Sequence, residues 1–288
     1  LDQNRTLCIP FAIGVLTNIT HEHLDYHKTY ENYLVAKSRL IKSANTGILN
    51  KDDASYPLVV KILKGKKKIV TYGMHDADYT KQTISSFKTN LIGDYNLYNI
   101  LAATAASDQL GISMDNIKKA VETFTLPKGR TEVVYRDEFT VMIDFAHTPN
   151  AFKQLLSTLK KTKNRGKIIH VFGSAGLRDS SKRPFMGEIA SEFDDCIIIT
   201  AEDPRSEPVD KIIAEIASGI IRLKDFPEVH KISDRQKAID FAISIAGKGD
   251  IVVVTGKGHE ESMNLGKGEM AWSDHEAVKK AIAKRYEK

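Results

Sequence analysis

Five short apolar segments in the second half of the chain alternate with five segments of helical pattern, and this alternation restricts the possible folds more than any other feature. The apolar segments cover residues 140–144, 167–172, 196–200, 229–232 and 251–255, and the helical ones lie near 149–160, 182–193, 210–218, 234–246 and 274–285. Such alternation predicts a mostly parallel sheet with helices on both faces. We therefore expect a Rossmann-like, doubly wound α/β domain.

The loops that follow four of these segments contain most of the charged residues and glycines of this region. They are residues 144–149, 173–183, 201–207 and 256–260. Because ligands of open parallel sheets bind at the C-terminal ends of the strands, these loops are the expected place of a binding site.

The first half of the chain has a less regular pattern. A strand at 11–16, a helix at about 29–43, a short strand at 48–50 and two or three further strands up to about residue 88 precede helices at about 95–110 and 113–124. The basic run at 64–68 lies between apolar pairs without interleaved aromatic residues, which predicts a solvated hairpin and no nucleic-acid contact. The break at 126–129 predicts domains at 1–130 and 131–288.

The composition excludes several classes of protein. With 42% hydrophobic and 27% charged residues, the 288-residue chain is typical of globular domains. No apolar run approaches the roughly 18 to 20 residues of a membrane span, and residues 1–5 are not a signal peptide. Cys8 and Cys196 lack metal-ligand spacing, which predicts free thiols in a reducing compartment. The net charge of +5 suits anionic small molecules.

Residues 21–27 contain three histidines, but their order excludes the His-Glu-x-x-His motif of zinc proteases. Taken alone, this cluster fits structural or solvated histidines, and Lys37 fits an exposed lysine of a helix. Residues 17–27 together with Tyr33 and Lys37 nevertheless resemble the segment T-N-x-T-x-D-H-L-D-Y-H…Y…A-K of the Mur ligase family, with Glu22 at the place of the usual Asp.

This resemblance implies a magnesium site. It implies that His23 binds Mg²⁺ and that Lys37 is carbamylated, which gives an anionic oxygen ligand of the kind that Mg²⁺ prefers. Residues 1–5 are similar to the L-x-Q-x-R stretch of the same family, which implies that Gln3 and Arg5 contact a UDP-N-acetylmuramoyl peptide.

Three further stretches resemble nucleotide-binding segments of the family. They are residues 93–99, similar to G-x-F/Y-N-x-x-N, residues 126–132, similar to V-P-G-R-M-E, and residues 143–150, similar to V-D-Y-A-H-T-P-D. Two asparagines three residues apart share a helix face and offer amides that fit a purine edge, and helix capping with a polar helix face is the alternative explanation. The resemblance implies ATP contacts from Asn96, Asn99, Arg130, Asp144 and His147.

An acceptor site is implied by the segments at 171–187, 200–207 and 255–260, which resemble V-F-G-C-G-G-D-R-D…K-R-P, T-x-D-N-P-R-x-E and A-G-K-G-H-E. A zwitterionic amino acid needs donors for its carboxylates and acceptors for its ammonium groups. The implied acceptor residues are Arg183, Glu202, Asp203, Arg205, Gly256 and Glu260, with Arg183 also implied in catalysis.

The identity of the acceptor stays open at this point. Arg205 occupies the place of the arginine that pairs with the distal carboxylate of meso-diaminopimelate in the family, which favours diaminopimelate. Asp203, where the family has Asn, adds a negative charge beside that carboxylate and keeps lysine as an alternative.

The resemblance covers the whole chain and implies the C-terminal part of an ATPase-like α/β central domain followed by the family's C-terminal domain. The implied activity is that of a monomeric, cytoplasmic ligase with Mg²⁺, which uses ATP to form an acyl phosphate on UDP-N-acetylmuramoyl-L-Ala-D-Glu. The amine of diaminopimelate or lysine then attacks, in the synthesis of peptidoglycan precursors.

Two alternatives remain, one of which rests on a missing motif. The chain contains no G-x-x-x-x-G-K-[ST] phosphate-binding loop. We therefore expect the C-terminal portion of a longer protein, inactive alone and with exposed sheet edges, or else a non-catalytic binding module or half-enzyme that needs a separate ATPase segment. Another amide ligase of the superfamily, similar to folylpolyglutamate or cyanophycin synthetase, is the other alternative.

Overall fold

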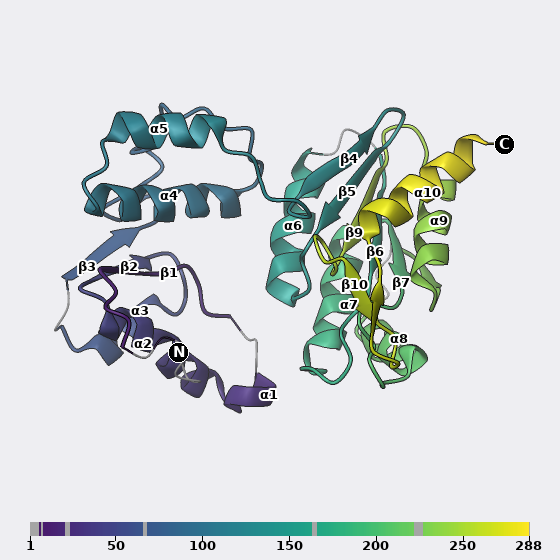
Figure 1. Ribbon diagram of the computed structural model, residues 1–288, viewed down its shortest axis with the longest axis horizontal. Helices are drawn as coiled ribbons and strands as arrows, with labels where there is room; N and C mark the ends of the chain where they lie inside the picture. Colours follow the sequence, from purple (N-terminus) through teal and green to yellow (C-terminus); the bar gives the residue numbers. More distant parts are fainter. Residues whose placement is uncertain are drawn as a thin grey trace. The chain divides into compact units, whose positions relative to one another are not determined.

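The computed structural model describes residues 6, 8–20, 24–65, 68–162, 166–221 and 227–287. The chain forms two compact units, Leu1–Thr125 and Leu126–Lys288, which are described separately (Figure 1). Unit 1 contains a three-stranded parallel sheet in the order β1 (Ile13–Leu16), β2 (Thr46–Asn50) and β3 (Lys68–Tyr72).

Helices cover both faces of the sheet in unit 1. Helices α2 (Tyr30–Ser43) and α3 (Tyr56–Leu63) pack on one face through a core that includes Ile41, Leu49 and Val59. Helix α4 (Asp94–Gln109) packs on the other face, where Ile48 and Leu101 are fully buried. A short helix α1 (Leu24–His27) precedes α2, and α5 (Met114–Thr123) follows α4.

The predicted hairpin around the basic run is wrong in its first half. Residues 59–62 belong to α3, which begins with a proline in its first turn and buries Val59 and Leu63, four residues apart on one face. The chain then turns through Lys64 and Gly65, which have φ angles of 51° and 69°, and only β3 is a strand. Residues 73–93 contribute one isolated bridge, between Tyr72 and Tyr79, in place of the further strands that we expected.

Unit 2 contains a six-stranded sheet in the order β4-β5-β9-β6-β7-β8. All neighbouring strands are parallel except β4 and β5, so the predicted doubly wound α/β fold is confirmed. The strands are β4 (Glu132–Arg136), β5 (Thr140–Asp144), β6 (Ile168–Phe172), β7 (Cys196–Ile199), β8 (Glu228–Lys231) and β9 (Ile251–Thr255). The sequence analysis did not predict β4 or the central place of β9.

Five helices cover the two faces of this sheet. Helices α6 (Pro149–Thr162), α7 (Lys182–Phe193) and α8 (Val209–Ser218) pack on the face that contains Val253. Helices α9 (Arg235–Ile245) and α10 (Asp274–Tyr286) pack on the opposite face, with Val252 and Val254. Successive side chains of a strand point to opposite faces, which explains why β9 is apolar throughout.

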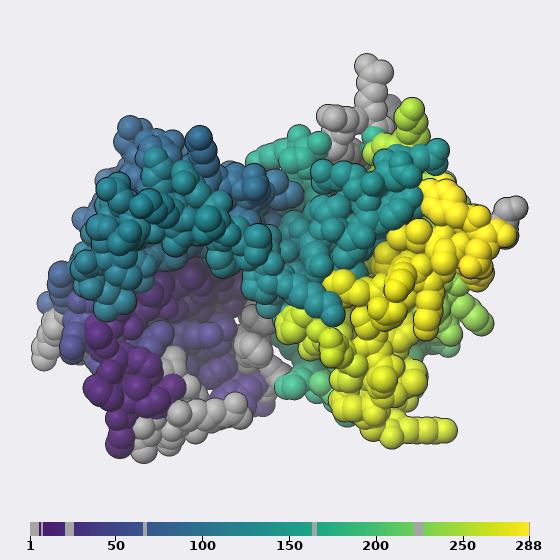
Figure 2. Space-filling view, turned by 45° about the horizontal axis from the view of Figure 1, so that its top comes forward, coloured from purple at the N-terminus to yellow at the C-terminus, as the bar shows by residue number. Residues whose placement is uncertain are grey.

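A hairpin of β10 (Ser262–Asn264) and β11 (Glu269–Ala271) leads from β9 to α10, and the sequence analysis did not predict it. The segment from this hairpin to the C-terminus forms a continuous part of the surface of unit 2 (Figure 2). Both cysteines are free thiols, as predicted. None of the helices in the described ranges is long and apolar enough to cross a membrane.

Candidate functional site

Loops at the C-terminal ends of neighbouring strands meet in unit 2, as the alternation of strands and helices predicts. The loop after β6 reaches the loop after β7, where the Gly176 amide donates a hydrogen bond of 2.8 Å to the carbonyl of Asp203. The loop after β9 also contacts the loop after β7, because a Cβ atom at Gly256 would lie 2.6 Å from Glu202 Oε2. A side chain at Gly256 would be strained by the φ angle of 105° and would also have to displace the carboxylate of Glu202.

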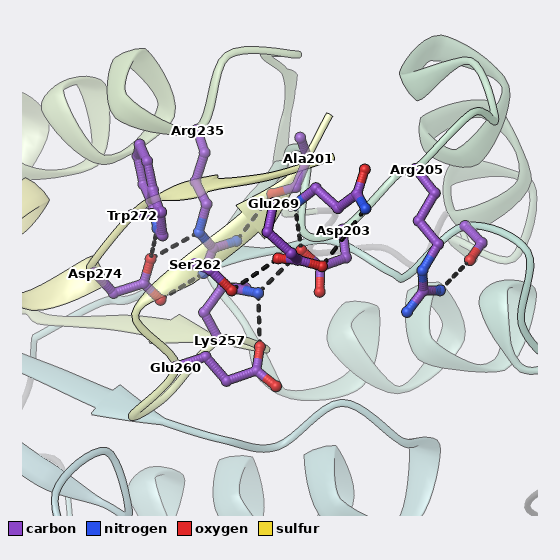
Figure 3. Close-up of polar contacts among 12 residues, drawn as sticks. Ala201, Asp203, Arg205, Arg235, Lys257, Glu260, Ser262, Glu269, Trp272 and Asp274 are labelled. Carbon is purple, nitrogen blue, oxygen red and sulfur yellow. Dashed lines mark hydrogen bonds and ion pairs between the residues drawn. The ribbon is translucent and has the colours of Figure 1, made fainter. Parts of the chain in front are cut away.

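A buried arginine holds two of these strand ends at fixed positions. Arg235 is fully buried and donates two hydrogen bonds to Asp274, of 2.8 and 2.7 Å. Two further N–H donors of Arg235 reach the carbonyl of Ala201, at 3.0 Å (Figure 3), and that of Thr255, at 2.9 Å. These two residues precede the site residues of the two loops. The sequence analysis missed this pair, because the two residues lie far apart in the sequence and match no quoted motif.

The acceptor segments contain a buried lysine that the sequence analysis quoted but did not assign to the site. The ammonium of Lys257 lies 3.0 Å from Asp203 Oδ1 and 2.6 Å from Glu260 Oε2 (Figure 3). Asp203 Oδ1 also accepts a hydrogen bond of 3.0 Å from the backbone of Asn264 in β10. The structure therefore brings the predicted residues Asp203 and Glu260 together around one lysine.

Glu202 is the most isolated carboxylate of the site. It is 7% exposed, and its Oε2 accepts no hydrogen bond from the described residues. Burial raises the pKa of its carboxyl group above the usual value, although the positive charge of Lys182 acts in the opposite direction. A buried carboxylate oxygen without a donor is costly, and an ammonium group of a ligand would satisfy it.

Arg183 lies in a different environment from that of the other predicted acceptor residues. Its guanidinium is fully buried, with bonds of 2.9 and 2.8 Å to Glu207 and a further bond of 2.5 Å to Glu215. This pairing lowers the pKa of Glu207 to about 2. Arg183 is thus already paired within the protein, and its predicted role toward an acceptor stays a prediction.

Arg205 is held by its backbone in a left-handed conformation, with φ of 52°. Its amide donates a hydrogen bond of 2.9 Å to Asn264, and its guanidinium donates to the carbonyl of Gly176. A non-glycine residue in this conformation is strained by its side chain, so the loop must be fixed by such contacts. The contacts orient a guanidinium that keeps donors for a carboxylate.

The predicted nucleotide residues of unit 2 surround one aromatic ring. The guanidinium of Arg130 lies 4.5 Å from the ring centre of Phe145, and the rings of His147 and His259 lie 4.8 and 5.1 Å from it. Gly129 permits this packing, since a Cβ atom there would lie 2.2 Å from the backbone nitrogen of His259. Sequence reasoning gave no role to Phe145 or His259, although both lie within the quoted segments.

Asp144 ends β5 beside this cluster. Its Oδ2 accepts hydrogen bonds from the backbone, at 2.6 Å, and the hydroxyl, at 3.1 Å, of Thr131, and its Oδ1 accepts one of 2.6 Å from the amide of Ala146. The carboxylate is thereby oriented at the strand end. A hydrogen bond from a ribose hydroxyl would add to these contacts.

The predicted site residues of unit 1 are placed only in part. His23, Gln3 and Arg5 lie outside the described residues. Lys37 is half-buried in α2, its ammonium lies 5.3 Å from the ring centre of Tyr33, and none of the described residues forms an ion pair with it. Its modification to a carbamate stays a prediction.

The two asparagines lie at the start of α4. The buried amide of Asn96 donates a hydrogen bond of 2.8 Å to the carbonyl of Ile92, and Asn99 lies 3.5 Å from the side-chain oxygen of Asn96. Asn96 therefore helps to fix the entry into the helix. Contact of either amide with a purine stays a prediction.

Comparison with known proteins identifies the family to which this architecture belongs. The Mur ligase middle domain matches residues 1–107, and the Mur ligase glutamate ligase domain matches residues 129–258. The chain belongs to the Mur ligase family.

The relatives define the similarity more closely. A UDP-N-acetylmuramoyl-L-alanyl-D-glutamate–2,6-diaminopimelate ligase of Aquifex aeolicus is 39% identical over 98% of this chain and 61% of its own length. A solved structure of a ligase with the same name matches 99% of this chain and 63% of its own, with 32% identity and a TM-score of 0.57. MurF from Acinetobacter baumannii, at 15% identity, shares the fold with a TM-score of 0.72 over 97% of this chain and 60% of its own. The chain thus spans about three-fifths of the length of the relatives that it matches.

Proposed function

We propose that this chain is part of an ATP-dependent ligase that joins a diamino acid to UDP-N-acetylmuramoyl-L-Ala-D-Glu in peptidoglycan precursor synthesis in the cytoplasm. The names of the relatives at 39% and 34% identity support this reaction. The structural observation that carries the proposal is the pair of carboxylates from Asp203, in the loop after β7, and Glu260, in the loop after β9. Arg205 lies in the same loop as Asp203. This combination suits an amino acid with an ammonium and a carboxylate at its distal end.

The proposed reaction has two steps, and the protein acts on both mainly by positioning its substrates. A carboxylate of the D-glutamyl residue first takes the γ-phosphoryl group of ATP and becomes an acyl phosphate, and ADP is released. The free amine of the acceptor then attacks the acyl carbon, phosphate leaves, and an amide bond forms. The carboxylates of unit 2 hold the acceptor through its ammonium group, and Arg205 binds its distal carboxylate.

The nucleotide and the metal have separate proposed sites. Arg130, Phe145 and His147 would contact the adenosine and its phosphates, with Asp144 on the ribose and Asn96 and Asn99 on adenine. Lys37, as a carbamate, and His23 would hold Mg²⁺, which neutralises phosphate charge when it is bound. The half-buried position of Lys37 in α2, at the place of the carbamylated lysine in the family motif, supports the carbamate.

The choice of acceptor is tested by Arg205. If diaminopimelate is the substrate, Arg205→Ala removes the donor to its distal carboxylate and weakens kcat/KM for diaminopimelate much more than that for lysine. Loss of a charge-assisted hydrogen bond of this kind costs about 1.5–3 kcal/mol, or roughly ten- to a hundredfold. Equal losses for the two amino acids would remove the proposed carboxylate contact.

The activity itself is tested with two proteins. The 288-residue chain and the gene product with any upstream coding sequence are incubated with ATP, UDP-N-acetylmuramoyl-dipeptide and each diamino acid, and amide formation is followed by mass spectrometry. We expect product only with an upstream phosphate-binding loop, because the chain contains no such motif. Turnover by the chain alone would refute the half-enzyme view. No turnover by either protein would refute the ligase proposal and favour a binding module.

A further inference from the structure

Lys257 is the least expected charged group of the acceptor segments. Its side chain is only 1% exposed, although the ammonium of a lysine is strongly hydrated and is rarely buried without partners. Both partners are carboxylates from different loops, Asp203 after β7 and Glu260 after β9. The lysine therefore lies where the two predicted acceptor loops meet.

The charges of this group leave room for one further cation. Asp203 and Glu260 carry two negative charges, and Lys257 balances one of them. Each carboxylate uses one oxygen on the lysine, and in the described part of the chain its other oxygen accepts no hydrogen bond. The group can therefore still accept the ammonium of a ligand.

The two neighbouring buried arginines have carboxylate partners of their own. Arg235 is paired with Asp274 (Figure 3), and Arg183 with Glu207 and Glu215. Removing the charge of Lys257 leaves these two arginine pairs in place and makes the surroundings of Asp203, Glu260 and the buried Glu202 more negative by one charge.

We propose that Lys257 is a specificity-determining residue, whose buried ammonium reduces the negative charge of Asp203 and Glu260 so that the site accepts a diamino acid with a distal carboxylate. The inference rests on the proposed ligase function. Without Lys257, two uncompensated carboxylates would repel the distal carboxylate of diaminopimelate. They would still attract the distal ammonium of lysine, which has no carboxylate beside it.

The test compares kcat/KM for meso-diaminopimelate and L-lysine in the gene product as encoded, with any upstream sequence included. In Lys257→Met the ratio of diaminopimelate to lysine should fall at least about tenfold, which corresponds to about 1.4 kcal/mol. Asp203→Asn should change the ratio in the opposite direction. The double variant Lys257→Met/Asp203→Asn should return it toward the wild-type value, because it restores the net charge.

Lys248→Met is the matched control, since this lysine is exposed in the loop that precedes β9. It should leave the ratio unchanged. Circular dichroism and thermal unfolding identify variants that fail to fold. If Lys257→Met does not fold, the ratio is measured in Lys257→Arg and in Asp203→Asn instead. Lys257→Arg keeps the positive charge and should keep the ratio, whereas Asp203→Asn should raise it.

The outcomes separate the two proposals. If Lys257→Met reduces kcat/KM for both amino acids by the same factor, or if the double variant does not restore the ratio, Lys257 has only a structural role and this inference is wrong. If the wild-type protein uses neither amino acid, the proposed function fails and this inference fails with it.

Discussion

The buried pair of Arg235 and Asp274 allows a quantitative prediction for the stability of unit 2. Arg235→Met removes four hydrogen bonds, two to Asp274 and one to each of two strand-end carbonyls. It leaves a fully buried carboxylate in the first turn of α10, for which the described residues supply one further donor, Trp272 Nε1 at 2.9 Å. Removing one partner of a buried ion pair costs about 3–5 kcal/mol, so we expect a loss in that range.

The assay uses the single tryptophan of the chain. Trp272 donates its hydrogen bond to Asp274 itself, so its fluorescence during urea unfolding reports on the unit that contains the pair. The double variant Arg235→Met/Asp274→Leu should be less destabilised than the sum of the single variants, with a coupling of at least about 2 kcal/mol. Lys284→Met is the control, because its partner Asp240 forms a surface pair worth at most about 1 kcal/mol.

Two results would refute this reasoning. One is a loss below about 1 kcal/mol for Arg235→Met, which would mean that water or a rearranged side chain replaces the guanidinium at little cost. The other is simple additivity in the double variant, which would mean that the two residues act independently.

Three further predictions concern single residues. Glu202→Gln should increase the free energy of unfolding at pH 7. The pKa of Glu202 is raised in the folded protein, so deprotonation of this carboxyl group at higher pH destabilises the fold, and glutamine removes that cost. Urea unfolding at pH 4 and pH 7 checks this, and a lower free energy of unfolding at pH 7 would contradict it. Arg183 lowers the pKa of Glu207 from 4.5 to about 2. The ion pair of these two residues therefore stabilises the fold fully above the pKa that Glu207 has in the unfolded chain, and this stabilisation is lost as the pH falls from about 5 toward 2. Glu207→Gln should flatten that part of the stability curve, and an unchanged slope would disprove the assignment. Gly129→Ala should destabilise unit 2 by more than about 2 kcal/mol in thermal or urea unfolding, because the φ angle of Gly129 is 70° and the added methyl group would lie 2.2 Å from a backbone atom. The control is Gly111→Ala, where φ is 81° and the methyl group enters open space, so the cost should be only about 1 kcal/mol.

The sequence predicts the elements of unit 2 well because local apolar periods determine them. The antiparallel strand β4 escaped prediction, since a half-buried edge strand has a weak apolar pattern. The position of β9 in the sheet depends on pairing with β5 and β6, strands that lie far away along the chain, and no local pattern contains that information.

The errors in unit 1 and in the site have different causes. Val59, Val60 and Ile62 fit a strand by residue type, but their spacing also fits the buried face of a short helix, and packing against α2 decides between them. The site motifs predicted which loops meet. They did not predict that Lys257 and Arg235 are buried, because burial of a charged side chain depends on partners that only the folded chain brings together.

The central place of β9 has a consequence for the order in which unit 2 can fold during synthesis. Within the described ranges, β5 pairs with β4 and β9 and β6 pairs with β7 and β9, so β9, residues 251–255, joins the two parts of the sheet. On the ribosome, residues 145–250, more than a third of this chain, are made after β5 before this joining strand. The loops of the nucleotide and acceptor segments thus come together only after β9 has been made, and a product that stops before residue 251 would leave the edges of β5 and β6 unpaired and open to aggregation.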